Sequence, residues 1–152
     1  MAFTLKSTAF SNEETIPDKY TCQGNDISPP LQIEGVPENT KSMALIVDDP
    51  DAPNGTFTHW VLYNLNPETT ELREAMPPDE RVQGTSLQGM NDFNRVGYGG
   101  PCPPSGTHRY YFKLYALDTE LDLESKATKT DVESAIRNHV LAETQLMGKF
   151  SK

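Results

Sequence analysis

Basic residues are scarce in this chain. Its 152 residues include 13 Lys and Arg against 22 Asp and Glu, and the formal net charge at pH 7 is −9. Proteins that bind nucleic acids draw most of their affinity from Lys and Arg contacts with phosphates. The composition therefore argues against nucleic-acid binding and against an anionic membrane surface. Any site for an anion must be built locally, from a few hydrogen-bond donors.

Long apolar runs are also absent. None approaches the roughly 20 residues that cross a bilayer, and the N-terminal sequence MAFTLKSTAF has no basic segment followed by an apolar one. We therefore expect no signal peptide, no membrane insertion and a cytoplasmic location. The length predicts one domain over residues 1–152, large enough to fold without metal or disulfides.

Cysteine occurs only twice, as Cys22 and Cys102. Neither has a second cysteine at C-x-x-C spacing, which argues against a zinc site. Two reduced thiols are the expected state. The alternative is a disulfide, which would close a loop of roughly 80 residues and add about 4–5 kcal/mol to the free energy of unfolding.

Runs of branched and aromatic residues predict strands along most of the chain. The strongest are MALIVD (Met43–Asp48), THWVLYNL (Thr58–Leu65) and THRYYFKLYALD (Thr107–Asp118). Alternation in the last run places His108 and Tyr110 on one face, together with three apolar residues. FTLKS near the start and LQIEGV (31–36) are weaker strand patterns, and we expect a loop between residues 77 and 106.

The C-terminal segment has apolar residues at helical spacing. Thr130 and Glu133 have the separation of a capping box. The pattern predicts a helix from Asp131 to Met147 that ends at Gly148, with His139 on its buried face as a hydrogen-bonded core residue. Strands first and a helix last indicate a mainly β protein, an antiparallel β-sandwich with peripheral helices.

Three segments contain residues suited to binding or catalysis. In the turn Asp48–Pro53, two prolines stiffen the backbone and hold the carboxylates in place. His59 stands at the start of a predicted strand. In GGPCPPSGTHRYY, glycines permit close approach of the backbone to a ligand, just before His108 and Tyr110. From the residues alone, these features fit either a binding site or ordinary loops.

The motifs DPDAP, THWVLYN and GPCPPSGTHRYYFKLYALD follow one another, with GNDISPPL upstream. In these motifs the chain resembles the phosphatidylethanolamine-binding protein (PEBP) family, which includes the Raf kinase inhibitor proteins, and above all its bacterial and archaeal branch. The resemblance implies a PEBP-like fold of two packed antiparallel sheets. It also implies a small surface pocket for anionic groups such as phosphate or a phospholipid headgroup, for example phosphoethanolamine.

The resemblance also assigns residues, motif by motif. The ligand-binding candidates are Asp49, His59, Gly100, Pro101, His108 and Tyr110. Asp51, Trp60 and Arg109 match motif positions as supporting residues. By the same resemblance we expect a binding protein and not an enzyme, with no cofactor or metal, a homodimer, and a protein kinase or protease as a partner. Both cysteines lie in motif segments, which keeps a disulfide open.

A carboxylate beside an anion is repulsive, and two arrangements resolve this. Asp49 accepts a hydrogen bond from a histidine and favours its imidazolium form, which then faces the anion. Alternatively, Asp49 meets the ammonium of a zwitterion while His108 and Tyr110 hold its phosphate. If a histidine drives binding, anion affinity rises as pH falls through about 6.5, the reference histidine pKa.

Two other functions remain open at this point. Asp49, His59 and His108 could form a two-histidine, one-carboxylate metal site of a hydrolase. The segment Gly84–Tyr98 could inhibit a partner protein through a surface loop that acts independently of the pocket.

Overall fold

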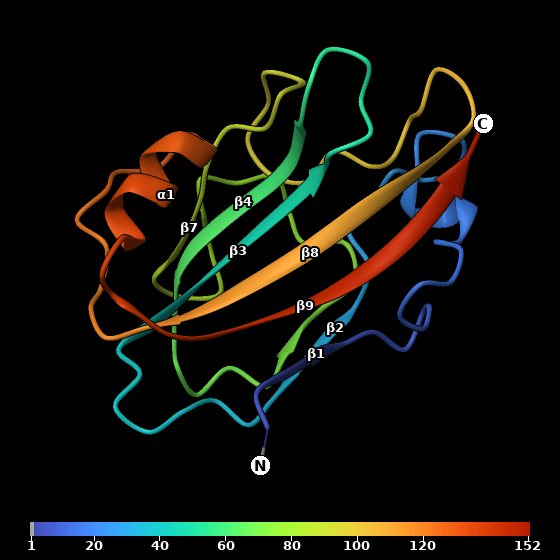
Figure 1. The fold of residues 1–152 in the computed structure, drawn as a ribbon. Coiled ribbons are helices and arrows are strands. Elements are labelled where there is room, and N and C mark those ends of the chain that lie inside the picture. The colour runs from blue at the N-terminus through green and yellow to red at the C-terminus, as the bar shows by residue number, and fades with distance from the viewer. Residues whose placement is uncertain (1) are drawn as a thin grey trace.

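The computed structural model describes residues 2–152 and is built from two antiparallel sheets (Figure 1). The smaller sheet has the order β1-β2-β5 and the larger one the order β6-β7-β4-β3-β8-β9. The strands are β1 (Thr4–Lys6), β2 (Leu31–Glu34), β3 (Ser42–Asp49), β4 (Phe57–Leu65), β5 (Glu71–Leu72), β6 (Arg81–Val82), β7 (Ser86–Gln88), β8 (Thr107–Leu117) and β9 (Val140–Ser151). A single 3₁₀ turn, η1 (Asp18–Tyr20), and one helix, α1 (Lys129–Ile136), complete the described chain. The mainly β, antiparallel architecture predicted from the sequence is confirmed.

Strand β3 lies at the centre of the larger sheet, between β4 and β8. All of its residues are buried, as its nearly continuous apolar sequence requires for a strand covered on both faces. Met43, Leu45 and Val47 belong to the core between the two sheets, whereas Ala44 and Ile46 belong to the core beneath α1. Figure 1 shows α1 on one side of β3 and β4, away from β1 and β2.

The predicted C-terminal helix is wrong over most of its length. Helix α1 covers Lys129–Ile136, and Thr128 and Asp131 form its capping box. After a turn at Asn138, whose φ is 69°, the chain forms β9, which pairs with β8 along its whole length. The apolar residues of this segment fit a helical pattern, but an antiparallel ladder with β8 satisfies their backbone groups and still buries Leu146 and Phe150.

The prediction for His139 is wrong for the same reason. This residue lies in the turn before β9, where 44% of its side chain is exposed and its Nδ1 is 2.8 Å from Asp118 Oδ1. It is a surface residue paired with a carboxylate.

The segment predicted as a loop between residues 77 and 106 contains two short strands, β6 and β7. Gln88 at the end of β7 organises this segment, because its Nε2 donates to the carbonyl oxygens of Pro77 and Asp79. Its Oε1 accepts from Trp60 Nε1 at 2.8 Å. The segment is therefore attached to β4 by side-chain as well as backbone hydrogen bonds.

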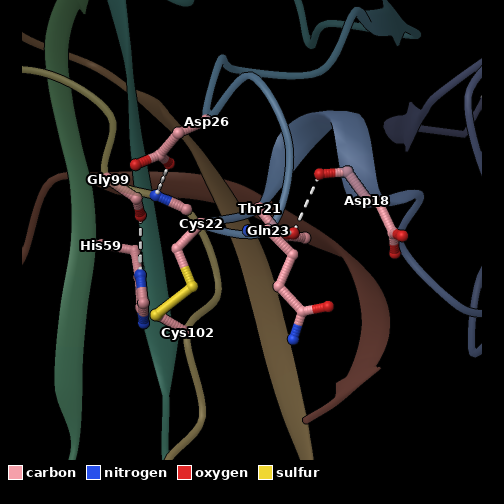
Figure 2. Close-up of a disulfide and its surroundings, with 9 residues drawn as sticks. Asp18, Thr21, Cys22, Gln23, Asp26, His59, Gly99 and Cys102 are labelled. Carbon is pink, nitrogen blue, oxygen red and sulfur yellow. Dashed lines mark hydrogen bonds between the residues drawn. A yellow bond between two sulfur atoms is a disulfide. The ribbon is translucent and has the colours of Figure 1, made fainter.

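Cys22 and Cys102 form a disulfide, with their Cα atoms 5.4 Å apart (Figure 2). The expectation of two reduced thiols is therefore wrong, because it followed from the assumed compartment and not from the positions of the residues. Over residues 2–152, no helix combines the length and apolar character needed to cross a bilayer.

Candidate functional site

The ends of three strands form a pocket of about 490 Å³. Since β3 runs antiparallel to both neighbours, its last residue, Asp49, lies beside the beginnings of β4 and β8. These beginnings contribute His59, His108 and Tyr110 to the pocket. The remaining lining comes from residues 52–57 of the β3–β4 loop, from Asp92 and Phe93, and from residues 102–104.

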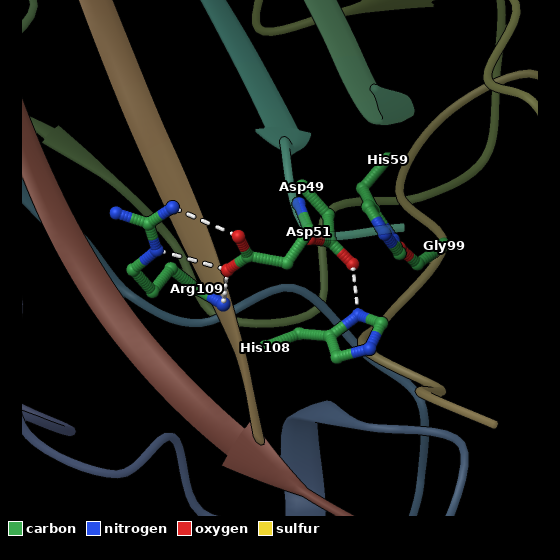
Figure 3. A network of polar contacts seen from close by, with 6 residues as sticks. All are labelled: Asp49, Asp51, His59, Gly99, His108 and Arg109. Atoms are coloured by element: carbon green, nitrogen blue, oxygen red, sulfur yellow. Dashed lines mark hydrogen bonds and ion pairs between the residues drawn. The ribbon is translucent and has the colours of Figure 1, made fainter. Parts of the chain in front are cut away.

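Asp49 is buried, and protein donors occupy both of its carboxylate oxygens (Figure 3). Oδ1 accepts from the backbone N–H of Asp51 at 2.7 Å, and Oδ2 lies 2.6 Å from His108 Nδ1. A carboxylate has no proton to give, so the histidine Nδ1–H is the donor. This bond fixes the tautomer and the orientation of the His108 ring.

His108 then has one ring nitrogen left for a ligand. Its Nδ1 is committed to Asp49, and the ring forms part of the pocket lining. In the neutral ring Nε2 is an acceptor, and in the imidazolium it is a donor. The carboxylate of Asp49 compensates the positive charge of the imidazolium, so the pair can present an N–H to an anion.

His59 offers the pocket a hydrogen-bond acceptor, whereas the protonated His108 offers a donor. It is 3% exposed, and its Nδ1 donates to the carbonyl oxygen of Gly99 at 2.7 Å. Burial lowers the pKa of His59, against smaller effects of the Gly99 carbonyl and of Asp49 that raise it. The neutral ring therefore dominates at neutral pH, and its Nε2 can only accept a hydrogen bond.

An aromatic wall made of Phe57, His59, Phe93 and Tyr110 bounds the pocket. Ring centroids are 4.9 Å apart for Phe57 and His59, 4.8 Å for Phe57 and Phe93, and 5.2 Å for His59 and Tyr110. Burial, followed by the charges of Asp49 and Asp51, raises the pKa of the Tyr110 phenol. The hydroxyl stays protonated at neutral pH and can donate to a ligand.

Asp51 and Arg109 hold the β3–β4 loop against β8 (Figure 3). Asp51 Oδ1 accepts from Nη2 at 2.8 Å, and Oδ2 accepts from Nε and from the backbone N–H of Arg109, both at 2.9 Å. The hydrogen bond from Arg109 lowers the pKa of Asp51 to about 2. This bidentate pair positions the loop that carries one side of the pocket.

Gly100 and Pro101 are not among the lining residues of the described chain; they lie in the segment behind the wall. The backbone N–H of Gly100 donates to Asp26 Oδ1 at 2.7 Å, and the carbonyl of Pro101 accepts from Cys22 N–H at 3.1 Å. A Cβ atom at position 100 would lie 2.4 Å from the carbonyl oxygen of Tyr20. Only glycine fits this close approach of two backbones.

Trp60 is buried and lies outside the pocket lining. Its ring packs edge-on against Tyr98 with centroids 5.5 Å apart, and Tyr98 in turn donates to the carbonyl oxygen of Tyr20 at 2.7 Å. These contacts join β4 to the two loops behind the pocket.

A family model described as phosphatidylethanolamine-binding protein matches residues 6–151 of the chain. The chain belongs to the phosphatidylethanolamine-binding protein family. A relative from the archaeon Methanothermobacter thermautotrophicus, named a UPF0098 protein, is 53% identical over 97% of this chain and 98% of its own length.

Solved structures give the same assignment. A Chlamydia trachomatis protein described as a PEBP homologue has a TM-score of 0.91 and 44% identity, over 99% of this chain and 98% of its own. Escherichia coli YbcL, described as a member of the mammalian PEBP family, has a TM-score of 0.93 and 31% identity, over 100% of this chain and 99% of its own. The PEBP-like fold expected from the motifs is therefore confirmed.

The PEBP motifs located the four central side chains, Asp49, His59, His108 and Tyr110, but not the rest of the pocket. Phe57 stands two residues before His59 on the same strand face, so alternation could have indicated it. Asp92 and Phe93 belong to the segment interpreted as an independent interaction loop, and nothing local in the sequence places them beside His59. In the described chain, no group of three or more His, Cys, Asp or Glu side chains is arranged to hold a metal ion.

Proposed function

We propose that the protein binds a small zwitterion in this pocket, one that combines a phosphoryl group with an amine, and that it acts by binding and not by turnover. The observation that carries the proposal is the Asp49–His108 pair, which turns one imidazole nitrogen towards a ligand within an aromatic wall. Family membership supports the same class of ligand.

The charges of the lining support a zwitterion over a simple anion. Over residues 2–152 the lining contains the carboxylates Asp49 and Asp92 but no Lys or Arg. A multiply charged anion would meet only the imidazolium of His108 as a full positive charge. A ligand that brings its own ammonium compensates part of the negative charge of the lining.

In the proposed pose, the phosphoryl oxygens accept from His108 Nε2–H and from the Tyr110 hydroxyl. The ammonium lies near Asp92 and over the faces of Phe57 and Phe93, where cation–π attraction favours it. His59 Nε2 accepts a hydrogen bond from a P–OH group or from the ammonium. Both oxygens of Asp49 are already occupied, so this pose corresponds to the arrangement in which Asp49 acts through the histidine.

The proposed cellular role is control of a partner protein kinase or protease by the occupied pocket. The support for it is the family resemblance of the motifs. A role of the Gly84–Tyr98 segment that is independent of the pocket fits the geometry less well, because Phe93 packs against His59 with ring centroids 5.5 Å apart. A partner bound through this segment would therefore respond to the pocket.

Titration of ¹⁵N-labelled protein with phosphoethanolamine, and separately with phosphate, tests the ligand proposal. We expect saturable amide shifts around Asp49, His59, His108 and Tyr110, tighter binding of phosphoethanolamine than of phosphate, and larger affinity at pH 6 than at pH 8. Loss of a charge-assisted hydrogen bond costs about 1.5–3 kcal/mol, so His108→Ala should weaken binding by about tenfold or more.

The matched control is His139→Ala, since His139 also pairs with a carboxylate but lies outside the pocket. It should bind like the native protein. Equal binding by both variants, or shifts spread away from the pocket, would refute the proposed site.

A further inference from the structure

The rim of the pocket around Cys102 is held differently from the neighbouring residues 98–101, which lie behind the aromatic wall. Residues 98–101 have three hydrogen bonds to the loop at residues 20–26. Tyr98 donates to the Tyr20 carbonyl, Gly100 N–H to Asp26, and Cys22 N–H to the Pro101 carbonyl, at 2.7, 2.7 and 3.1 Å. Gly99 adds two bonds to His59, because its N–H donates to the His59 carbonyl at 2.9 Å and its own carbonyl accepts from His59 Nδ1. Most of these bonds do not involve the cysteines, so hydrogen bonds hold residues 98–101 independently of the disulfide.

The rim segment, residues 102–105, has no such hydrogen bonds, and only Pro103 within it is buried. Pro103 and Pro104 lack an N–H, and within residues 2–152 no hydrogen bond from the side chain of Ser105 or from the backbone of 103–105 attaches the rim to the rest of the protein. The next attachment is at Gly106, whose carbonyl accepts from Lys152 N–H at 3.3 Å and whose φ is +69°. The Cys22–Cys102 bond is thus the covalent anchor of the rim.

The same rim forms part of the ligand site. Cys102, Pro103 and Pro104 line the pocket together with residues of the β3–β4 loop, His59 and His108. Cys22 and Cys102 are both exposed residues, so we expect an external thiolate to reach the disulfide. Accessible disulfides exchange with thiols, whereas buried ones do not.

We propose that Cys22–Cys102 is a thiol–disulfide exchange site that controls the pocket, and that a dithiol reductant releases the rim and weakens ligand binding. The regulatory part rests on the proposed ligand function, whereas release of the rim does not. In the exchange, a thiolate of the reductant attacks one sulfur and the other cysteine leaves as a thiolate. The second thiol of the reductant then resolves the mixed disulfide. The protein gains two electrons and two protons, and the reductant becomes a disulfide.

Two consequences follow from the way the segments are attached. On reduction, residues 102–105 gain freedom while residues 98–101 stay ordered. A freed rim must be ordered again when a ligand binds, so affinity falls by roughly tenfold for the few side chains concerned. The ligand still meets His108 and Tyr110, and binding is weakened without being abolished.

The experiment uses the full chain in three forms: oxidised, reduced with dithiothreitol under native conditions, and the double variant Cys22→Ser/Cys102→Ser. Mass spectrometry after thiol alkylation measures reduction. ¹⁵N relaxation of the amides of Cys102 and Ser105, compared with Gly99 and Gly100, measures the motion of the rim. Phosphoethanolamine titrations measure the affinity, and circular dichroism verifies that each form is folded.

We expect reduction without denaturant, increased motion confined to the rim, and about tenfold weaker binding in the reduced and double-variant forms. A disulfide that resists native reduction, or a rim that stays as ordered as residues 99 and 100, would overturn the proposal. Equal affinity of all three forms would overturn its regulatory part and leave the ligand function intact. If no form binds the ligand, the ligand function and the regulation both fail. The relaxation data then still test whether reduction releases the rim.

Discussion

Asp48 and Asp49 are consecutive in β3, yet their carboxylates serve different layers of the molecule. Asp49 bonds His108 at the pocket, whereas Asp48 Oδ2 accepts from Lys129 of α1 at 2.9 Å and from Lys113 of β8 at 3.2 Å. Asp48 is 1% exposed, and among described atoms its Oδ1 is a buried side-chain oxygen without a hydrogen-bond partner. One carboxylate holds the ligand site and the other attaches the helix to the sheet.

Matched substitutions separate these roles. Asp48→Asn leaves two lysines without their charge partner and should lower the free energy of unfolding by about 1–3 kcal/mol, less than for a fully buried pair because both lysines reach solvent. Asp48 is not among the residues that line the pocket. Its replacement should therefore leave the affinity for phosphoethanolamine within about twofold of the native value. Asp49→Asn should weaken binding more than it changes stability. Urea unfolding and ligand titration of both variants measure this, and the reverse pattern would contradict the assignment.

The buried histidine of the pocket predicts a pH dependence of stability. Burial lowers the pKa of His59 in the folded state below its unfolded value. Between the folded and unfolded pKa values the unfolded chain binds more protons, so stability rises with pH there. The contribution is fully present above about pH 6.5 and is lost as pH falls below that value.

Replacement of His59 by Gln removes this titration while keeping a side chain that can bond the Gly99 carbonyl. The unfolding free energy of His59→Gln should therefore decline less between pH 7.5 and pH 5 than that of the native protein. His139→Ala, which alters an exposed histidine, is the control for general effects of losing an imidazole. Parallel pH profiles for the native protein and His59→Gln would show that His59 does not titrate in this way.

The strands were predictable because their signal is local. In β8, alternation placed His108 and Tyr110 on the buried face with Phe112, and the structure confirms that face. The segment Val140–Ser151 was not predictable in this way, because its apolar residues fit helical spacing as well as alternation. Its conformation is decided by pairing with the long strand β8. Even where the two strands are nearest in sequence, at Leu117 and Val140, the partners are more than 20 residues apart.

The site shows the same division between local and long-range information. Asp49, His59, His108 and Tyr110 lie in distinctive motifs, so their type and order were sufficient to select them. Phe93 reaches the pocket through a close approach of its loop to Gly99, where a Cβ atom would lie 2.3 Å from the Phe93 ring. No pattern near either residue encodes that contact.

The Asp51–Arg109 pair predicts a loss of stability in acid. Because the pKa of Asp51 is lowered to about 2, its contribution is present above its unfolded value of 3.8 and disappears as pH falls towards 2. Arg109→Gln should be less stable than the native protein at pH 7, and this difference should shrink at pH 3. Urea midpoints at the two pH values measure it, and Lys149→Gln, on the neighbouring strand β9, is the control. A difference that is independent of pH would mean that Arg109 acts through packing and not through the carboxylate.

A substitution at Gly100 tests whether residues 98–101 depend on close backbone contact with the 20–26 loop. An added methyl at this position would lie 2.4 Å from the Tyr20 carbonyl oxygen and 2.5 Å from Asp26 Oδ1, the acceptor of the Gly100 N–H. Overpacking against a backbone costs typically about 1–3 kcal/mol, so Gly100→Ala should lower the free energy of unfolding by that amount. It should also weaken phosphoethanolamine binding, because the carbonyl that orients His59 belongs to the preceding residue.

The control for Gly100→Ala is Ser105→Ala on the exposed rim, where a smaller side chain meets no such contact. Thermal unfolding and ligand titration of the two variants are compared with the native protein. Normal stability and affinity of Gly100→Ala would show that the 20–26 loop moves away at little cost. The position of His59 would then depend on β4 alone, and the close approach of residues 98–101 to the 20–26 loop would have no part in forming the pocket.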